Sequence, residues 1–216
     1  MKYQNTISGY RYSDATHSCA HAYLMPALKA ELHRIKSSFK GEDALRLFDL
    51  GCGNGSVAAS ITKEGWEVSG VDPSYEGISA AAKMYPHLHL KEGSAYDDLV
   101  SFYGRFPVVI SLEVVEHVYA PREYARTLFD LVEPGGTAII STPYHGYLKN
   151  LTLAVTGRMD THYTALWDHG HIKFWSIPTL TTLLKEAGFG DVRFVRVGRI
   201  PQLAKSMIAI AHKPKA

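Results

Sequence analysis

An apolar run that ends in a glycine-dense turn constrains this chain more than any other feature. Residues 47–50 read Leu-Phe-Asp-Leu, and residues 51–55 read Gly-Cys-Gly-Asn-Gly. The residues that follow, Val-Ala-Ala-Ser-Ile at 57–61, favour a helix. A buried strand that passes through a glycine turn into a helix is typical of nucleotide-binding α/β proteins. The alternative interpretation is a purely structural strand-to-helix turn.

Strand and helix patterns alternate along most of the chain. We expect strands at 45–50, 66–72, 88–90, 106–112 and 137–141, with helices between them. Two final β-rich runs, 192–197 and 207–211, predict an antiparallel hairpin at the sheet edge. The alternation predicts an α/β fold with a doubly wound, Rossmann-like, seven-stranded and mostly parallel sheet.

Two segments lie outside this alternation, and we assign both to one domain over residues 1–216. Residues 1–44 predict an N-terminal helical cap, with a helix over about 14–39 that Pro26 kinks or divides and that Gly41 ends. Residues 143–175 are rich in aromatic and histidine side chains. A connection of this length is usually a lid or a binding loop, so we predict a helical lid insertion there.

Composition excludes several classes of protein. The chain has 216 residues, 46% of them hydrophobic, which is enough for a large core. A formal net charge of +2 is too small to indicate a nucleic-acid partner. Cys19 and Cys52 have no metal-type spacing, and no apolar run has the length of a signal or a membrane span. We therefore expect a cytoplasmic protein that acts on a small molecule, with its oligomeric state open.

The glycine turn departs from the dinucleotide fingerprint. That fingerprint needs a third glycine where Ser56 stands, and Asp49 would repel a pyrophosphate from below the turn. A carboxylate in that position suits a ligand with a cationic end. Asp72 ends the second strand about 20 residues after Gly51, where an acid can accept hydrogen bonds from ribose hydroxyls. These features argue against a nicotinamide-dependent dehydrogenase.

Together these motifs resemble class I S-adenosylmethionine-dependent methyltransferases. The resemblance includes Leu-Val-Glu-Pro-Gly-Gly at 131–136 and Leu-Lys-Glu-Ala-Gly-Phe at 184–189. It implies S-adenosylmethionine as cofactor, with the glycine turn at its methionine and ribose, Asp72 at the ribose hydroxyls and Ser94 and Ala95 at the adenine. Ser94 is a departure, because the family often has Asp there. The cofactor-binding residues that the resemblance implies are Asp49, Gly51, Cys52, Gly53, Gly55, Asp72, Pro73, Ser94, Ala95, Glu113 and Val114. For Cys52, packing within the turn is the simpler interpretation.

A second cluster follows the fourth strand, where Ser-Leu-Glu-Val-Val-Glu-His spans 111–117. If the chain turns helical after Glu113, then Glu113, Glu116 and His117 share one helix face. This set of ligands suits a divalent cation such as Mg²⁺. The pattern resembles ubiquinone-biosynthesis O-methyltransferases, in which it implies a metal near the acceptor hydroxyl, and also small-RNA 2′-O-methyltransferases, which have a further histidine downstream. The lid offers four such histidines, His145, His162, His169 and His171.

Two other interpretations of this cluster stay open. His117, with Glu116, could be a metal-free catalytic base, or both could begin a helix without any chemical role. The favoured function is O-methylation of a small aromatic or apolar hydroxylated acceptor. N- or C-methylation, RNA 2′-O-methylation and a non-catalytic cofactor-binding module are the alternatives. Residues 148–155 could also form an amphipathic helix that touches membranes transiently.

Overall fold

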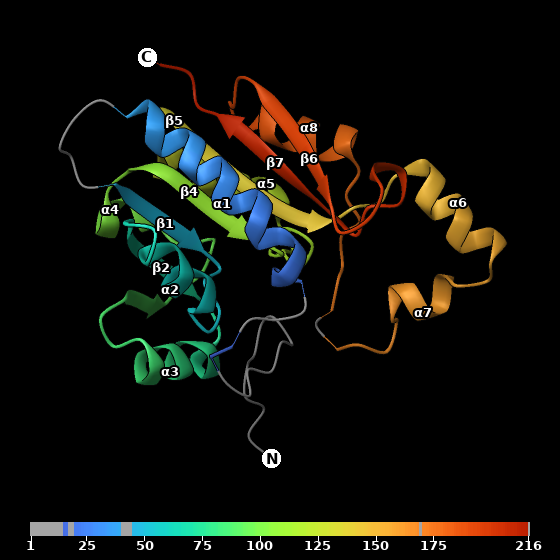
Figure 1. Ribbon diagram of the computed structural model, residues 1–216, viewed down its shortest axis with the longest axis horizontal. Coiled ribbons are helices and arrows are strands. Elements are labelled where there is room, and N and C mark those ends of the chain that lie inside the picture. Colours follow the sequence, from blue (N-terminus) through green and yellow to red (C-terminus); the bar gives the residue numbers. More distant parts are fainter. Residues whose placement is uncertain (1–14, 17–19, 40–44, 169, 216) are drawn as a thin grey trace.

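A computed structural model of the chain describes residues 15–16, 20–39, 45–168 and 170–215. Its centre is a seven-stranded sheet in the order β3-β2-β1-β4-β5-β7-β6 (Figure 1). The strands are β1 Arg46–Leu50, β2 Glu67–Asp72, β3 His89–Glu92, β4 Phe106–Leu112, β5 Val132–Pro143, β6 Val192–Val197 and β7 Ser206–His212. The first five pair in parallel, and β7 runs antiparallel between β5 and β6. The predicted fold class is therefore confirmed.

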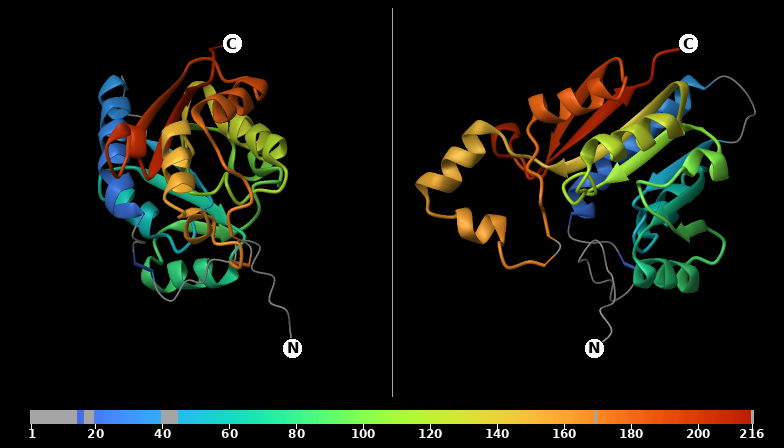
Figure 2. Two further views of the ribbon diagram at one scale, coloured as in Figure 1. Left: turned by 90° about the vertical axis from the view of Figure 1, so that its right-hand side faces the viewer. Right: turned by 180° about the vertical axis from the view of Figure 1, so that it is seen from behind.

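Helices cover both faces of the sheet, and α6 and α7 project beyond its edge (Figures 1 and 2). Two clusters of buried apolar residues hold the helices on the sheet. One packs α1 and α2 on one face of the sheet, and the other packs α5 and α8 on the opposite face. The helices are α1 His21–Ser38, α2 Ser56–Thr62, α3 Tyr75–Met84, α4 Leu99–Tyr103, α5 Pro121–Leu131, α6 Tyr147–Val155, α7 Met159–Tyr163 and α8 Ile177–Glu186, with a short 3₁₀ turn η1 Pro201–Leu203. The insertion after β5 is thus helical, as predicted.

Strand β1 occupies the middle of the sheet because its side chains are apolar on both faces. Leu47, Phe48 and Leu50 are all fully buried, as the two covered faces of a parallel sheet require. Asp49 is the exception, a buried carboxylate within an apolar strand. Since β1 pairs in parallel with β2 and β4, the carboxyl ends of all three strands meet at one edge. This edge is where ligands bind in open α/β sheets.

Two local expectations need correction. The N-terminal helix is not divided, because α1 continues through Pro26 without a break. The expected start of this helix near Asp14 and its expected end at Gly41 lie outside the described residues, as does Cys19. Strand β5 is longer than predicted: it begins at Val132, which pairs with Phe106, and includes residues 134–136, where a turn was expected. A register shift in the β4–β5 pairing and a hydrogen bond from Gly135 N–H to the Lys213 carbonyl accommodate this extension.

Candidate active site

One large cavity opens at the carboxyl edge of the sheet, with a volume of about 1030 Å³. The glycine turn and the ends of β2 and β4 form one end of it. The other end is formed by the β6–β7 connection and by the return segment of the insertion, from which Trp167, His171, Ile172 and Phe174 line the cavity. Of the predicted cofactor residues, those that line it are Asp49, Gly51, Cys52, Gly53, Asp72, Pro73, Ser94, Ala95, Glu113 and Val114.

Gly55 is the predicted cofactor residue that does not line the cavity. It stands at the start of α2 with a φ of 73°, a conformation that favours glycine. A Cβ at this position would lie 2.8 Å from Leu90 Cδ1 and 3.0 Å from Ala81 Cβ. The structure therefore explains Gly55 by close packing of α2 against the β3 and α3 side chains.

Gly51 has a different role, at the base of the cavity. Its φ is 91°, and an added Cβ would lie only 2.4 Å from Val114 Cγ2. Its N–H and that of Cys52 both donate to the Val71 carbonyl, at 2.8 and 3.0 Å. The turn is thus fastened to the end of β2, and a side chain at Gly51 would collide with the residue that follows β4.

Asp72 organises the loop on which a ribose would rest. One carboxylate oxygen accepts from Gly53 N–H at 2.9 Å and the other from Ser74 N–H at 2.8 Å. Ser74 in turn caps α3 by accepting from Gly77 N–H. Each oxygen of Asp72 keeps a lone pair for a ligand hydroxyl. Burial raises the pKa of Asp72, while these two backbone donors oppose the rise.

Asp49 is the residue that fits a cationic ligand most directly. It is 2% exposed, and its Oδ2 has no hydrogen-bond partner among the described residues. Burial, and then the neighbouring charge of Asp72, raise the pKa of Asp49 to about 8. A buried carboxylate that lacks a partner is costly, so a positive group placed in the cavity beside it would stabilise the ionised form.

Glu113 marks the point where β4 leaves the sheet. Its φ is 54°, a left-handed conformation that is uncommon for a residue with a side chain. Ser141 Oγ donates to one carboxylate oxygen at 2.8 Å, and Ser206 Oγ lies 3.5 Å from the other. Burial raises the pKa of Glu113 to about 7, although these serines and the Lys149 charge lower it. The side chain is therefore held by β5 and β7.

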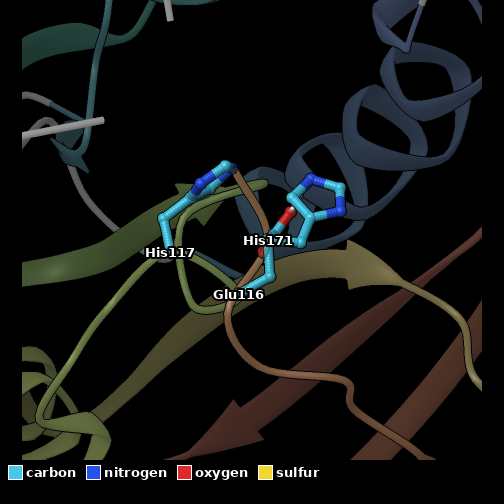
Figure 3. A group of neighbouring side chains, drawn as sticks. All are labelled: Glu116, His117 and His171. Atoms are coloured by element: carbon cyan, nitrogen blue, oxygen red, sulfur yellow. Dashed lines mark ion pairs between the residues drawn. The ribbon is translucent and has the colours of Figure 1, made fainter. Parts of the chain in front are cut away.

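The turn after Glu113 is not the helix that we expected. His117 N–H donates to the Val114 carbonyl at 2.9 Å, which closes a single turn, and α5 begins only at Pro121. Consequently Glu113 does not share a face with Glu116 and His117. Within the described residues, the side chains that gather are Glu116, His117 and His171, whose ligand-type atoms all lie within 4.8 Å of one another (Figure 3).

Glu116 is the buried centre of this cluster. It is 1% exposed, and neither carboxylate oxygen has a hydrogen-bond partner among the described residues; His171 Nε2 lies 3.9 Å from one of them. Burial, and then the charge of Glu113, raise the pKa of Glu116 well above its usual range. Burial, followed by the charge of His117, lowers the pKa of His171 to about 4. His117 and His171 both line the cavity, whereas Glu116 lies behind them.

The insertion returns to the sheet by docking on this turn. The N–H groups of Ile172 and Lys173 both donate to the Glu116 carbonyl, at 2.9 and 3.0 Å. The buried indole N–H of Trp175 donates to the Val115 carbonyl at 3.0 Å. His117 Nδ1 lies 3.2 Å from the Gly170 carbonyl. These contacts place His171 beside Glu116, although the two residues are far apart in the sequence.

The remaining lid residues fall into separate groups. His145 and His162 pack with Tyr163 and Phe174 in an aromatic cluster, with ring centroids 4.9–5.8 Å apart. His169 lies outside the described residues. Trp167, Phe174 and Leu153 line the cavity. Other apolar residues of the insertion do not: Tyr147, Leu148 and Leu151 are exposed to solvent, and Trp175 is buried beneath the lid.

Sequence reasoning missed the basic side chains of the cavity. Lys149, Arg158, Arg199 and Lys205 line its lid end. No local pattern marks them, since they come from the insertion and from the β6–β7 connection. The same is true of Ser206, whose hydroxyl lies near Glu113.

The known proteins that this chain resembles include methyltransferases. A family model described as a methyltransferase domain matches residues 20–193. A ubiquinone biosynthesis O-methyltransferase of Caulobacter sp. is 33% identical over 69% of this chain, which spans 59% of that relative's length. One from Cereibacter sphaeroides is 30% identical over 81% of this chain and 72% of its own. Among solved structures, a SAM-dependent methyltransferase from Archaeoglobus fulgidus superposes with a TM-score of 0.61 at 19% identity, over 87% of this chain and 94% of its own.

Proposed function

We propose that this chain, which belongs to the class I S-adenosylmethionine-dependent methyltransferases, transfers the methyl group to a hydroxyl oxygen of a small aromatic or apolar acceptor. One observation carries the choice of an oxygen acceptor. Two cavity-lining imidazoles, His117 and His171, adjoin a buried carboxylate, Glu116, in the cavity that the cofactor turn also lines. The relatives named as ubiquinone biosynthesis O-methyltransferases support the same choice.

The cofactor end of the cavity fits S-adenosylmethionine in charge and in shape. The unpartnered Asp49 oxygen suits the cationic part of that molecule. Asp72 offers two oxygens to ribose hydroxyls while it fixes the loop below them. We assign the predicted cofactor residues to this task, with Gly55 reassigned to packing.

The chemistry at the acceptor end is the removal of a proton. Methyl transfer needs the acceptor oxygen, the methyl carbon and the sulfur in line, with water excluded. A hydroxyl oxygen attacks more readily once it has lost its proton, and His117 is placed to accept that proton. The Gly170 carbonyl, 3.2 Å from His117 Nδ1, would orient the imidazole, and Glu116, once ionised, would stabilise its positive charge.

The same three side chains also fit a divalent cation. Two imidazoles and a buried carboxylate are a typical set of ligands for Mn²⁺ or Fe²⁺, and Mg²⁺ would favour the carboxylate. A cation bound there would lower the pKa of an acceptor hydroxyl. We assign this site to Glu116, His117 and His171, in place of the predicted set with Glu113.

The lid supplies the walls that select the acceptor. Trp167, Phe174 and Leu153 give the cavity an apolar surface, and Ala20, His21 and Tyr23 close it from the N-terminal cap. We propose that α6 also touches membranes transiently, since Tyr147, Leu148, Leu151 and Val155 expose an apolar surface on it. No helix within the described residues could span a membrane.

Turnover of a panel of catechols, phenols, aromatic amines and thiols with S-adenosylmethionine tests the proposal, with product mass and fragmentation as the readout. We expect oxygen-methylated catechols or phenols. Products methylated only on nitrogen or carbon would reject the oxygen assignment. A structured RNA is tested as a further substrate. If the protein binds S-adenosylhomocysteine but methylates neither a panel member nor the RNA, a non-catalytic binding module is favoured.

The metal assignment has its own test. Activity is measured after treatment with a chelator and after adding back Mg²⁺, Mn²⁺ or Fe²⁺. Restored activity supports the site, provided that the Glu116→Gln variant no longer responds to added metal. Full activity after rigorous metal removal rejects it and leaves His117 as a metal-free base.

A further inference from the structure

We propose that the lid end of the cavity is an anion subsite that recognises a carboxylate or phosphate group on the acceptor. The inference rests on the proposed function, because it adds a second recognition element to the acceptor of the same reaction. It starts from four basic residues that line one end of the cavity: Lys149, Arg158, Arg199 and Lys205.

These cations come from two parts of the chain that face each other. Lys149 lies in α6, and Arg158 precedes α7. Arg199 and Lys205 lie in the connection between β6 and β7, on either side of η1. An anion between the two parts would be contacted from both sides, so its binding would also hold the insertion against the body of the protein.

Within the described part of the chain, the carboxylate whose charge acts on this group is Glu113, which opposes the lowering of the Lys149 pKa without forming an ion pair. None of the four basic residues forms an ion pair there. The acidic residues that line the cavity are Asp49, Asp72 and Glu113. Asp49 lies in β1 and Asp72 ends β2, both beside the glycine turn, and Glu113 is held by Ser141 and Ser206. Acidic side chains therefore line the cofactor end of the cavity and basic side chains line its lid end, although the chain as a whole is close to neutral.

Lys149 gives the subsite a fixed, buried element. It is 7% exposed, and its ammonium donates to the Tyr144 carbonyl at 2.8 Å and lies 3.4 Å from the Lys205 carbonyl. The Tyr144 N–H also donates to the Lys205 carbonyl. These bonds join the insertion to the β6–β7 connection. They use at most two of the three ammonium hydrogens, which leaves one for a ligand that faces the cavity.

The electrostatics of the neighbouring groups agree with this geometry. Burial, and then the charge of Arg199, lower the pKa of Lys149 to about 8, while the Glu113 charge opposes them. The charges of Lys149 and Arg199 also add to burial in lowering the pKa of His162. An anion bound at this end would reduce the electrostatic repulsion between Lys149 and Arg199. Arginine side chains in particular match the planar, two-oxygen face of a carboxylate or phosphate.

The test compares two catechols that differ by a carboxylate. Calorimetric titration of the S-adenosylhomocysteine-loaded protein is made with 3,4-dihydroxyphenylacetate and with 4-methylcatechol. We expect the acid to bind about tenfold more tightly, and Arg199→Gln to remove most of this advantage while leaving 4-methylcatechol unchanged. Arg199 and Arg158 are exposed, so both variants should fold. Arg126→Gln, an exposed arginine on α5 outside the cavity, is the matched control.

Two outcomes would overturn the subsite. One is equal affinity for the two catechols together with no effect of inorganic phosphate as a competitor. The other is that Arg199→Gln and Arg158→Gln abolish binding to vesicles of phosphatidylglycerol but leave the carboxylate preference intact, which would assign the cations to a lipid headgroup. This experiment measures binding and not turnover. Its result can therefore be interpreted even if the oxygen-methylation proposal is wrong.

Discussion

The two ends of the cavity are built on different principles. The cofactor end is made of short segments at the ends of neighbouring strands, near 49–55, 72–74 and 93–95, joined by backbone hydrogen bonds. The acceptor end brings together Glu116 and His117, the insertion and the β6–β7 connection, which only the tertiary fold places side by side. The first is acidic, and the second is basic with two imidazoles.

This difference indicates how the scaffold divides its tasks. In the proposed function, a sheet edge with fixed donors and a buried acid would provide one constant binding site for a cationic ligand. The insertion can change its side chains without disturbing that site, since it docks through the main chain of residues 115 and 116. Under this proposal, specificity for the acceptor would depend on residues that the fold itself does not require.

The largest expected effect separates turnover from cofactor binding. We expect Glu116→Gln and His117→Gln to lower kcat by about 10²–10⁴-fold, because they remove the base or its partner, and to change S-adenosylhomocysteine affinity by less than about twofold. Steady-state kinetics and calorimetry measure the two effects, with the exposed Glu92→Gln as control. If Glu116→Gln weakens cofactor binding as much as it lowers turnover, the two ends of the cavity do not bind their ligands independently.

The second-largest expected effect is a loss of cofactor binding caused by a substitution at the cofactor end. Asp72→Ala removes the acceptor of Gly53 and Ser74 and the proposed ribose partner, so we expect about 100-fold weaker binding of S-adenosylhomocysteine. Asp72→Asn, which keeps one acceptor oxygen, should give an intermediate loss. Titration calorimetry provides both values. Unchanged affinity in Asp72→Ala would reject the ribose assignment.

The sequence predicts which residues of the cofactor end line the cavity, because its signals are local. A strand, its terminal acid and the next turn are contiguous, so the order of residues already fixes which atoms meet at the edge of a parallel sheet. Ten of the eleven predicted cofactor residues line the cavity. The exception, Gly55, shows that a glycine motif does not distinguish close approach to a ligand from close packing of a helix.

The acceptor end was harder to predict because its geometry depends on distant contacts. Glu113 leaves the helical pattern when it adopts a φ of 54°, which no propensity of glutamate indicates. Among four lid histidines, only the docking of Ile172 and Lys173 on the Glu116 carbonyl singles out His171. The basic residues of the subsite belong to segments separated by α8 and β6, so no spacing rule could group them.

A smaller effect concerns the pH dependence of cofactor binding. The pKa of Asp49 is raised to about 8 in the ligand-free protein, and a cationic ligand would lower it. The free protein therefore holds a proton on Asp49 at pH 7 that binding must release. We expect affinity for S-adenosylmethionine to rise with pH by up to about tenfold per unit, levelling off above pH 8.

The Asp49→Asn variant isolates this effect from the titration of the ligand itself. Calorimetry at pH 7 in buffers of different ionisation enthalpy counts the protons released on binding. The wild-type protein should release more protons than Asp49→Asn, and the variant should lose the corresponding pH slope. Equal proton release by the two proteins would show that Asp49 is already ionised in the free state.

The smallest expected effect tests the tether between the lid and the sheet. Trp175→Phe removes the buried hydrogen bond to the Val115 carbonyl, so we expect the free energy of unfolding to fall by about 1–2 kcal/mol. Cofactor affinity should not change, because Trp175 does not line the cavity, whereas KM for the acceptor should rise a few-fold as the lid loosens. Denaturant unfolding and steady-state kinetics measure both quantities.

Trp167→Phe is the control for stability, since its indole makes no hydrogen bond within the described residues. A loss of cofactor affinity in Trp175→Phe equal to the rise in KM would mean that the insertion supports both ends of the cavity.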